Sequence, residues 1–351
     1  MDFGVTFPSK ITDYNLVMLA EEVGFQQAWF FDSQMIYSDV YATMALAAHT
    51  TKKIKLATGV AVPSTRMAPV IAHSIATVAQ IAPGRVELGV GNGNTARLTM
   101  GLKPLPLKKM KREIRTIQTL LKGEECLHDF GGNKKLIKLL HPDHGFINLK
   151  QKIPLTLSAF GEKTLAFCGA ECDAHLSWNI TPDTLVANRK IISESAISSN
   201  RDPSNIPTKA IVPLAILKPG ETIESDRVLR SVGPFITNLL HVLCEWDEKL
   251  LPADKTISEH VKQYKKYVAS LDPQRRHLML HEGHLIFTRD DELKYLVSEI
   301  ANIAAMIGTP TSIIERIKAL EEKGLTHFAF QITDSPEQEI KDFATNIIAR
   351  Y

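Results

Sequence analysis

The feature of this sequence that most constrains its fold is an alternation between short strand-like runs and longer helix-like segments. Over roughly the first 180 residues, runs rich in β-branched and aromatic residues alternate with segments of helical period. Such alternation is typical of successive β/α units, which build a parallel sheet. We expect strands at residues 3–6, 28–31, 54–60, 86–90, 154–158, 174–178, 210–217 and 326–332, with helices between them.

Eight expected strands fit an α/β fold of the (β/α)8 TIM-barrel type, and we expect residues 1–351 to form one domain. The stretch at about 218–306 has no convincing strand and two helical patterns, at 228–250 and 257–271. We interpret it as a helical insertion that carries substrate specificity. A doubly wound open sheet is the alternative, but it would more often show a glycine-rich fingerprint after the first strand, where this chain has Phe7-Pro8-Ser9-Lys10.

The composition favours small-molecule partners over nucleic acid or membranes. Lys and Arg total 41 against 39 for Asp and Glu, so the chain lacks the one-signed field that polyanions attract. The opening residues show neither a basic leader nor an apolar core, and no run is long enough to cross a bilayer. Four cysteines occur without paired-motif spacing, and Cys168 and Cys172 are expected to be buried small hydrophobes. We therefore expect a cytoplasmic protein.

The active site of a parallel barrel is assembled from the residues that follow each strand's carboxyl end. The strand at 86–90 is followed by a loop that contains Asn92, Asn94 and Thr95 among closely spaced glycines. Glycines let backbone N–H groups approach a ligand, and the polar side chains add donors for a phosphate, a ribityl chain or a ring edge. Tight β/α connections use glycines in the same way, so this loop alone leaves both interpretations open.

Two further strand ends carry comparable signals. The strand at 54–60 ends in Gly59-Val60, where a glycine indicates a bulge or a close approach by a ligand. The segment from Ser158 to Lys163 passes from strand to helix across Gly161, and free N–H groups at such a helix start bind anions. Each signal has a purely structural alternative.

Read in order, the segments resemble a known family. Gly59-Val60 with Pro63 and Thr65-Arg66, the run 83–91, and Gly101-Leu102 before a helix that ends near Gly123 are similar to the bacterial-luciferase-like superfamily. The branch that includes the deazaflavin-dependent methylenetetrahydromethanopterin reductases is the most similar one. The resemblance covers roughly residues 1–180 and returns at 308–330. It implies a barrel that binds coenzyme F420 or FMN at its strand ends, with a cis peptide at Gly59-Val60.

The resemblance also implies roles for individual residues. Asp32 is the expected catalytic acid, because it follows the second strand. Two departures leave the proton donor unidentified: Thr6 stands where the methanopterin reductases carry a carboxylate, and Ser33 stands where many deazaflavin enzymes have histidine. The cofactor-binding residues that we expect are Thr6, Ser33, Thr58, Gly59, Val60, Gly91, Asn92, Gly93, Asn94, Thr95, Ser158, Ala159, Phe160, Gly161, Glu162 and Lys163.

The sequence therefore predicts an oxidoreductase that transfers a hydride between F420 and a carbonyl, imine or alcohol carbon. The alternatives are an FMN-dependent monooxygenase and a non-catalytic flavin-binding barrel. A metal-dependent hydrolase is weighed on the cluster of His277, His281, Glu282 and His284, whose spacing does not fit a zinc-protease helix. We expect no metal, and interpret the cluster as substrate-facing or structural histidines. Trp29 and Phe31 are expected in the barrel core, and a homodimer is expected by analogy with the family.

Overall fold

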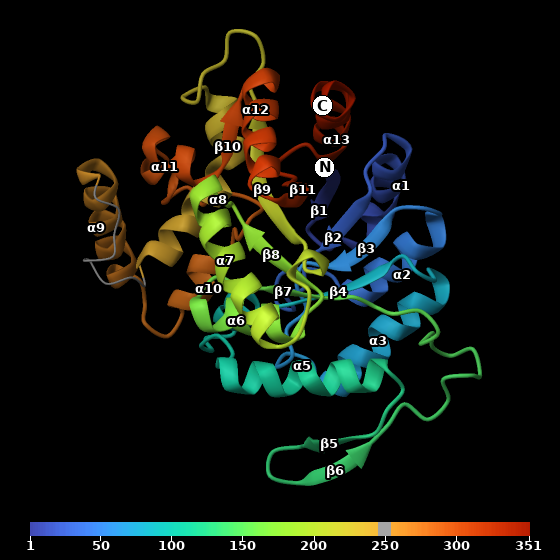
Figure 1. Cartoon of the computed structure of the whole chain (residues 1–351). Coiled ribbons are helices and arrows are strands. Elements are labelled where there is room, and N and C mark those ends of the chain that lie inside the picture. Colours follow the sequence, from blue (N-terminus) through green and yellow to red (C-terminus); the bar gives the residue numbers. More distant parts are fainter. Residues whose placement is uncertain (245–253) are drawn as a thin grey trace.

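The computed structural model describes residues 1–244 and 254–351 as a closed parallel barrel (Figure 1). Every pairing between neighbouring barrel strands is parallel, and the ring closes because β9 pairs with β8 on one side and with β11 on the other. This confirms the expected (β/α)8 fold. In ring order, the barrel strands are β1 (Asp2–Phe7), β2 (Gln27–Phe30), β3 (Lys55–Thr58), β4 (Val86–Val90), β7 (Leu155–Ser158), β8 (Ala174–Trp178), β9 (Thr208–Ile216) and β11 (Leu325–Gln331).

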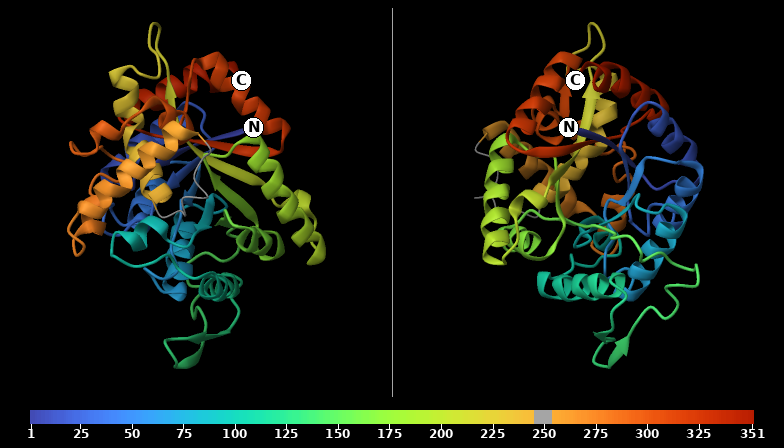
Figure 2. Two further views of the ribbon diagram at one scale, coloured as in Figure 1. Left: turned by 90° about the vertical axis from the view of Figure 1, so that its left-hand side faces the viewer. Right: turned by 45° about the vertical axis from the view of Figure 1, so that its right-hand side comes forward.

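Helices surround this barrel on the outside, as both views in Figure 2 show. Their starts follow ordinary capping chemistry: Asp39 accepts two backbone N–H bonds at the start of α2, and Thr309 caps α12 with a proline at its first position. The enclosing helices are α1 (Tyr14–Glu22), α2 (Val40–Thr50), α3 (Ala68–Ile81), α5 (Leu107–Leu121), α6 (Glu162–Glu171), α7 (Pro182–Ser198), α12 (Pro310–Glu322) and α13 (Pro336–Asn346).

Three short elements were not expected from the sequence. A hairpin of β5 (Cys126–Asp129) and β6 (Lys134–Ile137) projects away from the barrel beyond α5 (Figure 1). Strand β10 (Met306–Gly308) pairs with the end of β9, outside the closed ring. Helix α4 (Asn94–Leu98) begins inside the predicted cofactor loop. These elements have three to five residues each, too few to show a periodicity.

Between β9 and β10 the regular elements of the described residues are helices, as the sequence predicts for this stretch. The expected helix at 228–250 is α8 (Asp226–Cys244), and its predicted end lies outside the described residues. The second expected helix is α9 (Lys255–Ser270), followed by the short helices α10 (Arg276–His281) and α11 (Ser298–Ala304). These helices pack around an apolar cluster of their own, centred on Phe235, Tyr264 and Ile300. None of the helices in residues 1–244 and 254–351 is long and apolar enough to cross a membrane.

The interior of the barrel is filled in two layers. Near the amino ends of the strands, Lys209 Nζ lies 2.6 Å from a carboxylate oxygen of Glu87, which also accepts from Gln27 Nε2 at 2.9 Å. Above this polar layer, Trp29 and Phe31 belong to an apolar cluster, with 0% and 8% of their surfaces exposed. The barrel-core prediction for these two aromatic residues is confirmed. Cys168 and Cys172 are also buried and free, as expected.

Candidate active site at the mouth of the barrel

The carboxyl ends of the eight parallel barrel strands meet at one end, which we call the barrel mouth. The site residues expected from the sequence follow β1, β2, β3, β4 and β7, and these five strands are consecutive neighbours in the sheet. The fold therefore brings the predicted residues to one arc of the mouth. Their contact with a cofactor stays a prediction.

Thr6 points into the barrel near the mouth. Gly4, two residues earlier on the same face of β1, faces the interior, since a Cβ there would lie 2.5 Å from His327 Nε2. His327 is itself inside the barrel, where it accepts a hydrogen bond from Trp29 Nε1 at 3.1 Å. Thr6 is fully buried, and its hydroxyl has no hydrogen-bond partner in the protein. A buried hydroxyl without a partner is costly, so it fits contact with a polar ligand atom.

Asp32 is held in an ionic cluster at the end of β2. Arg66 Nη1 lies 2.6 Å and 2.8 Å from its two carboxylate oxygens, and Gln34 Nε2 donates to it at 2.5 Å. The other guanidinium nitrogen, Nη2, reaches Asp39 Oδ2 at 2.5 Å. Arg66 also lies over the ring of Tyr41, 5.3 Å from its centroid. The catalytic role of Asp32 stays a prediction, but both of its oxygens already have partners.

Burial and the neighbouring donors shift the carboxyl pKa values of this cluster in opposite directions. Burial raises the pKa of the Asp32 carboxyl above its usual value, while the adjacent Arg66 guanidinium acts in the opposite direction. The pKa of Asp39 is lowered: burial of its carboxyl is opposed by backbone N–H bonds at the start of α2 and by Arg66. Sequence reasoning missed Arg66 as the partner of Asp32. The sequence signal that could have indicated this ion pair is an acid and an arginine that follow neighbouring strands.

The peptide between Gly59 and Val60, directly after β3, is cis, as the family resemblance implies. The Val60 side chain packs against the apolar cluster inside the barrel. Thr58, immediately before, is fully buried and donates its hydroxyl to the carbonyl oxygen of Gly89 at 2.7 Å. Its hydroxyl is thus engaged inside the protein, and a cofactor contact for Thr58 stays a prediction.

Close packing within the protein accounts for the glycines at the end of β4 and after it. An added Cβ would lie 2.1 Å from Thr58 O at Gly89 and 2.6 Å from Val60 Cγ2 at Gly91. At Gly93 it would lie 2.5 Å from a methyl group of Val62, and the φ angle of 75° also favours glycine. Of the two interpretations left open by the sequence, the structure supports the close β/α connection. Exposed side chains in the same loop, at 92 and 94, remain available to a ligand.

The segment after β7 offers an open helix start. Gly161 precedes α6 without any side-chain cap, and its carbonyl accepts the backbone N–H groups of Thr164 and Leu165. Glu162 and Lys163 begin the helix at the surface, and their own N–H groups have no intrahelical partner. Together with the positive end of the helix dipole, this start suits an anionic group.

The predicted histidine cluster lies over the same mouth. His284 accepts or donates a hydrogen bond with Thr95 Oγ1 at 3.1 Å, and Leu285 packs against the apolar cluster inside the barrel. Within residues 1–244 and 254–351, no group of three or more His, Cys, Asp or Glu side chains is placed to hold a metal ion. The contact between His284 and Thr95 joins residues 189 positions apart and had no signal in the sequence.

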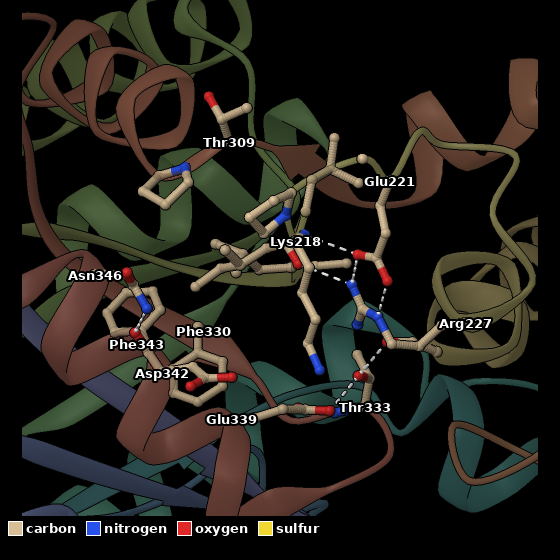
Figure 3. A pocket seen from close by; sticks show the side chains of 18 residues that line it. Lys218, Glu221, Arg227, Thr309, Phe330, Thr333, Glu339, Asp342, Phe343 and Asn346 are labelled. Carbon is tan, nitrogen blue, oxygen red and sulfur yellow. Dashed lines mark hydrogen bonds and ion pairs between the residues drawn. The ribbon is translucent and has the colours of Figure 1, made fainter.

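A cavity of about 520 Å³ lies outside the barrel wall, between the end of β9 and α13 (Figure 3). Phe330 and Phe343 form its apolar side, with ring centroids 4.6 Å apart. The carboxylate of Glu339 accepts the backbone N–H groups of residues 333–335, which lie in the loop before α13. The predicted site residues do not line this cavity.

The family of luciferase-like monooxygenases matches residues 14–327. The chain belongs to this family. A 5,10-methylenetetrahydromethanopterin reductase of Methanolobus tindarius is 34% identical over 230 residues, which are 62% of this chain and 66% of that protein. The reductase of the same name from Archaeoglobus fulgidus is 25% identical over 93% of this chain and 92% of its own length. An F420-dependent glucose-6-phosphate dehydrogenase of Microbacterium testaceum is 29% identical over 48% of this chain and 52% of that protein.

Solved structures agree with the fold. The coenzyme F420-dependent tetrahydromethanopterin reductase of Methanopyrus kandleri superposes with a TM-score of 0.72 at 19% identity, covering 100% of this chain and 99% of that one. An F420-dependent secondary alcohol dehydrogenase, solved with an F420-acetone adduct, gives a TM-score of 0.68 at the same identity and coverage. At such identities the likeness establishes a shared barrel.

Proposed function

We propose that this protein is an F420-dependent oxidoreductase that transfers a hydride between the coenzyme and a carbonyl, imine or alcohol carbon of a small organic substrate. The observation that carries the proposal is the similarity to a methylenetetrahydromethanopterin reductase over 93% of the chain and 92% of that relative. The first relative is matched over 66% of its length, and the glucose-6-phosphate dehydrogenase over about half. The substrate is therefore proposed only as a class.

The residues at the barrel mouth fit such a cofactor. The uncapped start of α6 suits its phosphate, with Lys163 beside it, and the buried hydroxyl of Thr6 suits a polar atom of the ring. When bound, F420 supplies a ring carbon that accepts or releases a hydride. The chain's own part is to orient the reactants above the apolar cluster and to exclude water from them. The cofactor-binding residues expected from the sequence stay part of this proposal.

FMN is the second candidate cofactor, since the family is described by its luciferase-like monooxygenases. The two cofactors predict different chemistry. FMN carries a ring nitrogen that supports oxygen activation, whereas the deazaflavin has carbon at that position and transfers hydride only. We favour F420 because the glucose-6-phosphate dehydrogenases that are similar to this chain are named as F420-dependent enzymes.

Titration of the purified protein with F420 and, in parallel, with FMN tests the proposal. We expect F420 fluorescence to be quenched on binding, and the Lys163→Ala variant to bind F420 about tenfold more weakly because it lacks a cation near the phosphate. Lys190→Ala, an exposed lysine on α7, is the matched control and should bind like the wild type. Binding of FMN alone would favour the monooxygenase. Binding of neither cofactor overturns the proposed function.

The proposal also covers the location of the protein, its domain organisation and its oligomeric state. We propose a cytoplasmic location, consistent with cysteines that lack paired-motif spacing, and a single working domain with the insertion at 218–306. We also propose a homodimer. Leu127 and Leu136 are a cross-strand pair on the β5–β6 hairpin, 61% and 70% exposed, and such an apolar pair on a projecting hairpin suits a contact between subunits. Size-exclusion chromatography of Leu136→Asp should then show a shift towards the monomer, and an unchanged elution volume would contradict the proposed interface.

A further inference from the structure

Three histidines, of which one is buried and two are partly buried, form a row that runs from the insertion to the barrel mouth. The ring centroids of His241 and His281 lie 5.6 Å apart, and those of His281 and His284 are separated by the same distance. At one end, His241 Nε2 lies 3.3 Å from a carboxylate oxygen of Glu292. At the other end, His284 Nε2 lies 3.1 Å from Thr95 Oγ1 on α4. The row of histidines thus lies between the buried carboxylate of Glu292 and the loop that follows β4.

Each of these histidines keeps one polar ring atom without a partner. The Nδ1 atoms of His241, His281 and His284 are all buried, and none has a hydrogen bond within the protein. Leaving a buried polar atom unpaired is costly, so folded proteins seldom keep three together. Such a cluster is expected where the missing partner comes from outside the chain.

Burial keeps the rings of His281 and His284 neutral near pH 7. It lowers the pKa of His281 to about 4, and it lowers the pKa of His284 well below its usual value, with further contributions from His281 and His241. A neutral imidazole has one N–H donor and one nitrogen with a free lone pair. If the Nε2–H group of His284 donates to Thr95, the lone pair lies on Nδ1 and is ready to accept a proton.

The backbone around His284 fixes this residue at the barrel mouth. Its carbonyl oxygen accepts the Tyr37 hydroxyl at 3.2 Å, and only 5% of His284 is exposed. The next residue, Leu285, packs on the apolar cluster inside the barrel. Leu285 adopts a φ angle of 58°, a conformation that leucine seldom takes and that folded proteins often retain at functional sites. The insertion therefore delivers an imidazole to the place where the substrate is expected.

His284 differs from Asp32, another titratable residue of the barrel mouth, in how its polar atoms are partnered. Both carboxylate oxygens of Asp32 are bound by Arg66, and one also accepts from Gln34. A proton exchanged by Asp32 would have to disrupt this ionic cluster. His284 needs no such rearrangement, because its Nδ1 atom has no partner to give up.

We propose that His284 exchanges with the substrate the proton that accompanies each hydride transfer, and that Thr95, His281 and His241 hold its ring in place. This inference rests on the proposed function. In the oxidising direction, the substrate C–H bond breaks and its electron pair leaves with the hydrogen to the cofactor, which is reduced. The substrate O–H or N–H bond also breaks, its proton binds to Nδ1, and a C=O or C=N bond forms. In the reducing direction, the hydride returns from the cofactor to the substrate carbon, and the proton returns from Nδ1 to the substrate oxygen or nitrogen.

Nuclear magnetic resonance of the histidine rings tests the placement without any substrate. The protein is labelled at histidine Cε1, and the His284 signal is identified by its loss in His284→Gln. We expect this signal to shift when F420 alone is added, since the ring would then border the bound cofactor. The signal of His128, a buried histidine on the β5–β6 hairpin, should stay in place and is assigned with His128→Gln.

Fluorescence quenching in the same sample separates the two possible failures. If F420 quenching shows full binding and the His284 signal does not move, this inference is overturned while the proposed function stands. If no quenching occurs, the proposed function is overturned and the inference falls with it. Should His284→Gln fail to fold, His284→Asn supplies the same assignment and the same comparison.

Rapid mixing measures the chemical step with the alcohol or ketone that changes the 420 nm absorbance of the bound cofactor. We expect His284→Gln to bind F420 within about threefold of the wild type and to transfer hydride about 10² to 10⁴ times more slowly. Its rate should also lose the pH dependence of the wild type, because the variant lacks the titrating ring, whose pKa is lowered by burial and by His281 and His241. Addition of imidazole to His284→Ala should restore part of the rate. A wild-type rate and pH profile in His284→Gln overturns the inference.

Discussion

Removal of Arg66 should destabilise the protein strongly, because it would leave a buried carboxylate without its counterion. The side chain of Asp32 is 3% exposed and that of Arg66 is 15% exposed, so both charges lie mostly outside water. Breaking one side of such a pair typically costs about 3–5 kcal/mol, whereas exposed pairs contribute about 0–1 kcal/mol. We therefore expect Arg66→Met to lower the free energy of unfolding by about 3–5 kcal/mol. Asp39, the second partner of Arg66, has a half-exposed side chain and should add little.

The double variant Asp32→Asn/Arg66→Met provides the matched control. It keeps similar shapes but contains no unpaired buried charge, so it should recover most of the stability lost in Arg66→Met. The direction in which pH changes the destabilisation by Arg66→Met follows from the pKa of Asp32. Without Arg66, the folded-state pKa of Asp32 rises further above its unfolded value, so the destabilisation is largest above the folded pKa. It should shrink as the pH falls from about 8 to about 5, because the folded state then takes up the proton.

Urea unfolding followed by circular dichroism measures these differences for the wild type, both single variants and the double variant. A loss below about 1 kcal/mol in Arg66→Met, or a loss that does not shrink at lower pH, would refute the argument. The same four proteins test the catalytic prediction for Asp32. If Asp32→Asn/Arg66→Met still transfers hydride, the carboxylate holds the loop and does not donate the proton.

Gly89→Ala should lose at least about 3 kcal/mol of stability in thermal or urea unfolding, because its Cβ would lie 2.1 Å from Thr58 O. Gly161→Ala, with nothing within 4 Å of its Cβ, should lose under about 1 kcal/mol, and equal losses would contradict this explanation. His175 has its pKa lowered from 6.5 to about 4 by burial, so the unfolded state takes up its proton first as the pH falls. Stability should then decrease by up to about 3 kcal/mol between about pH 6.5 and pH 4, and His175→Gln should weaken that decrease in urea titrations; an unchanged pH slope would count against it.

Leu285→Gly should relax the backbone at a φ angle of 58° and remove a side chain from the barrel mouth. We expect F420 to associate faster with this variant in stopped-flow fluorescence, since less of the mouth is filled. Leu278→Gly, an exposed leucine on α10, is the control for a glycine in the same segment. Slower association in Leu285→Gly would show that the side chain supports the bound state.

The alternation of strand-like and helical segments was enough to predict the barrel, because each β/α unit repeats the same pattern. The strands Val86–Val90 and Ala174–Trp178 begin and end where the sequence places them. The third strand ends at Thr58 and not at residue 60. Strand β10 has three residues, and its pairing with β9 is set by the insertion that precedes it. A local sequence pattern carries no information about which strand such a short segment pairs with.

The candidate site was predictable only as a set of positions. Sequence order places Asp32 and Arg66 after neighbouring strands, but it does not say that the two side chains meet. The glycines at 89 and 91 were equally compatible with a ligand and with close packing, and only the positions of Thr58 and Val60 decide between them. The contact of His284 with Thr95 depends on how the insertion folds over the barrel, which requires the tertiary structure.

The position of β11 has a consequence for the order in which this chain is made. This strand lies between β9 and β1, so residues near opposite ends of the sequence, such as Phe3 and Phe328, are register partners. During vectorial synthesis on the ribosome, the ring must stay open until about 330 residues have emerged. Until then β1 and β9 present free edges that can pair with other chains, and closure depends on contacts of very long sequence separation, which form slowly. The nascent chain is therefore the state in which this barrel is most exposed to aggregation.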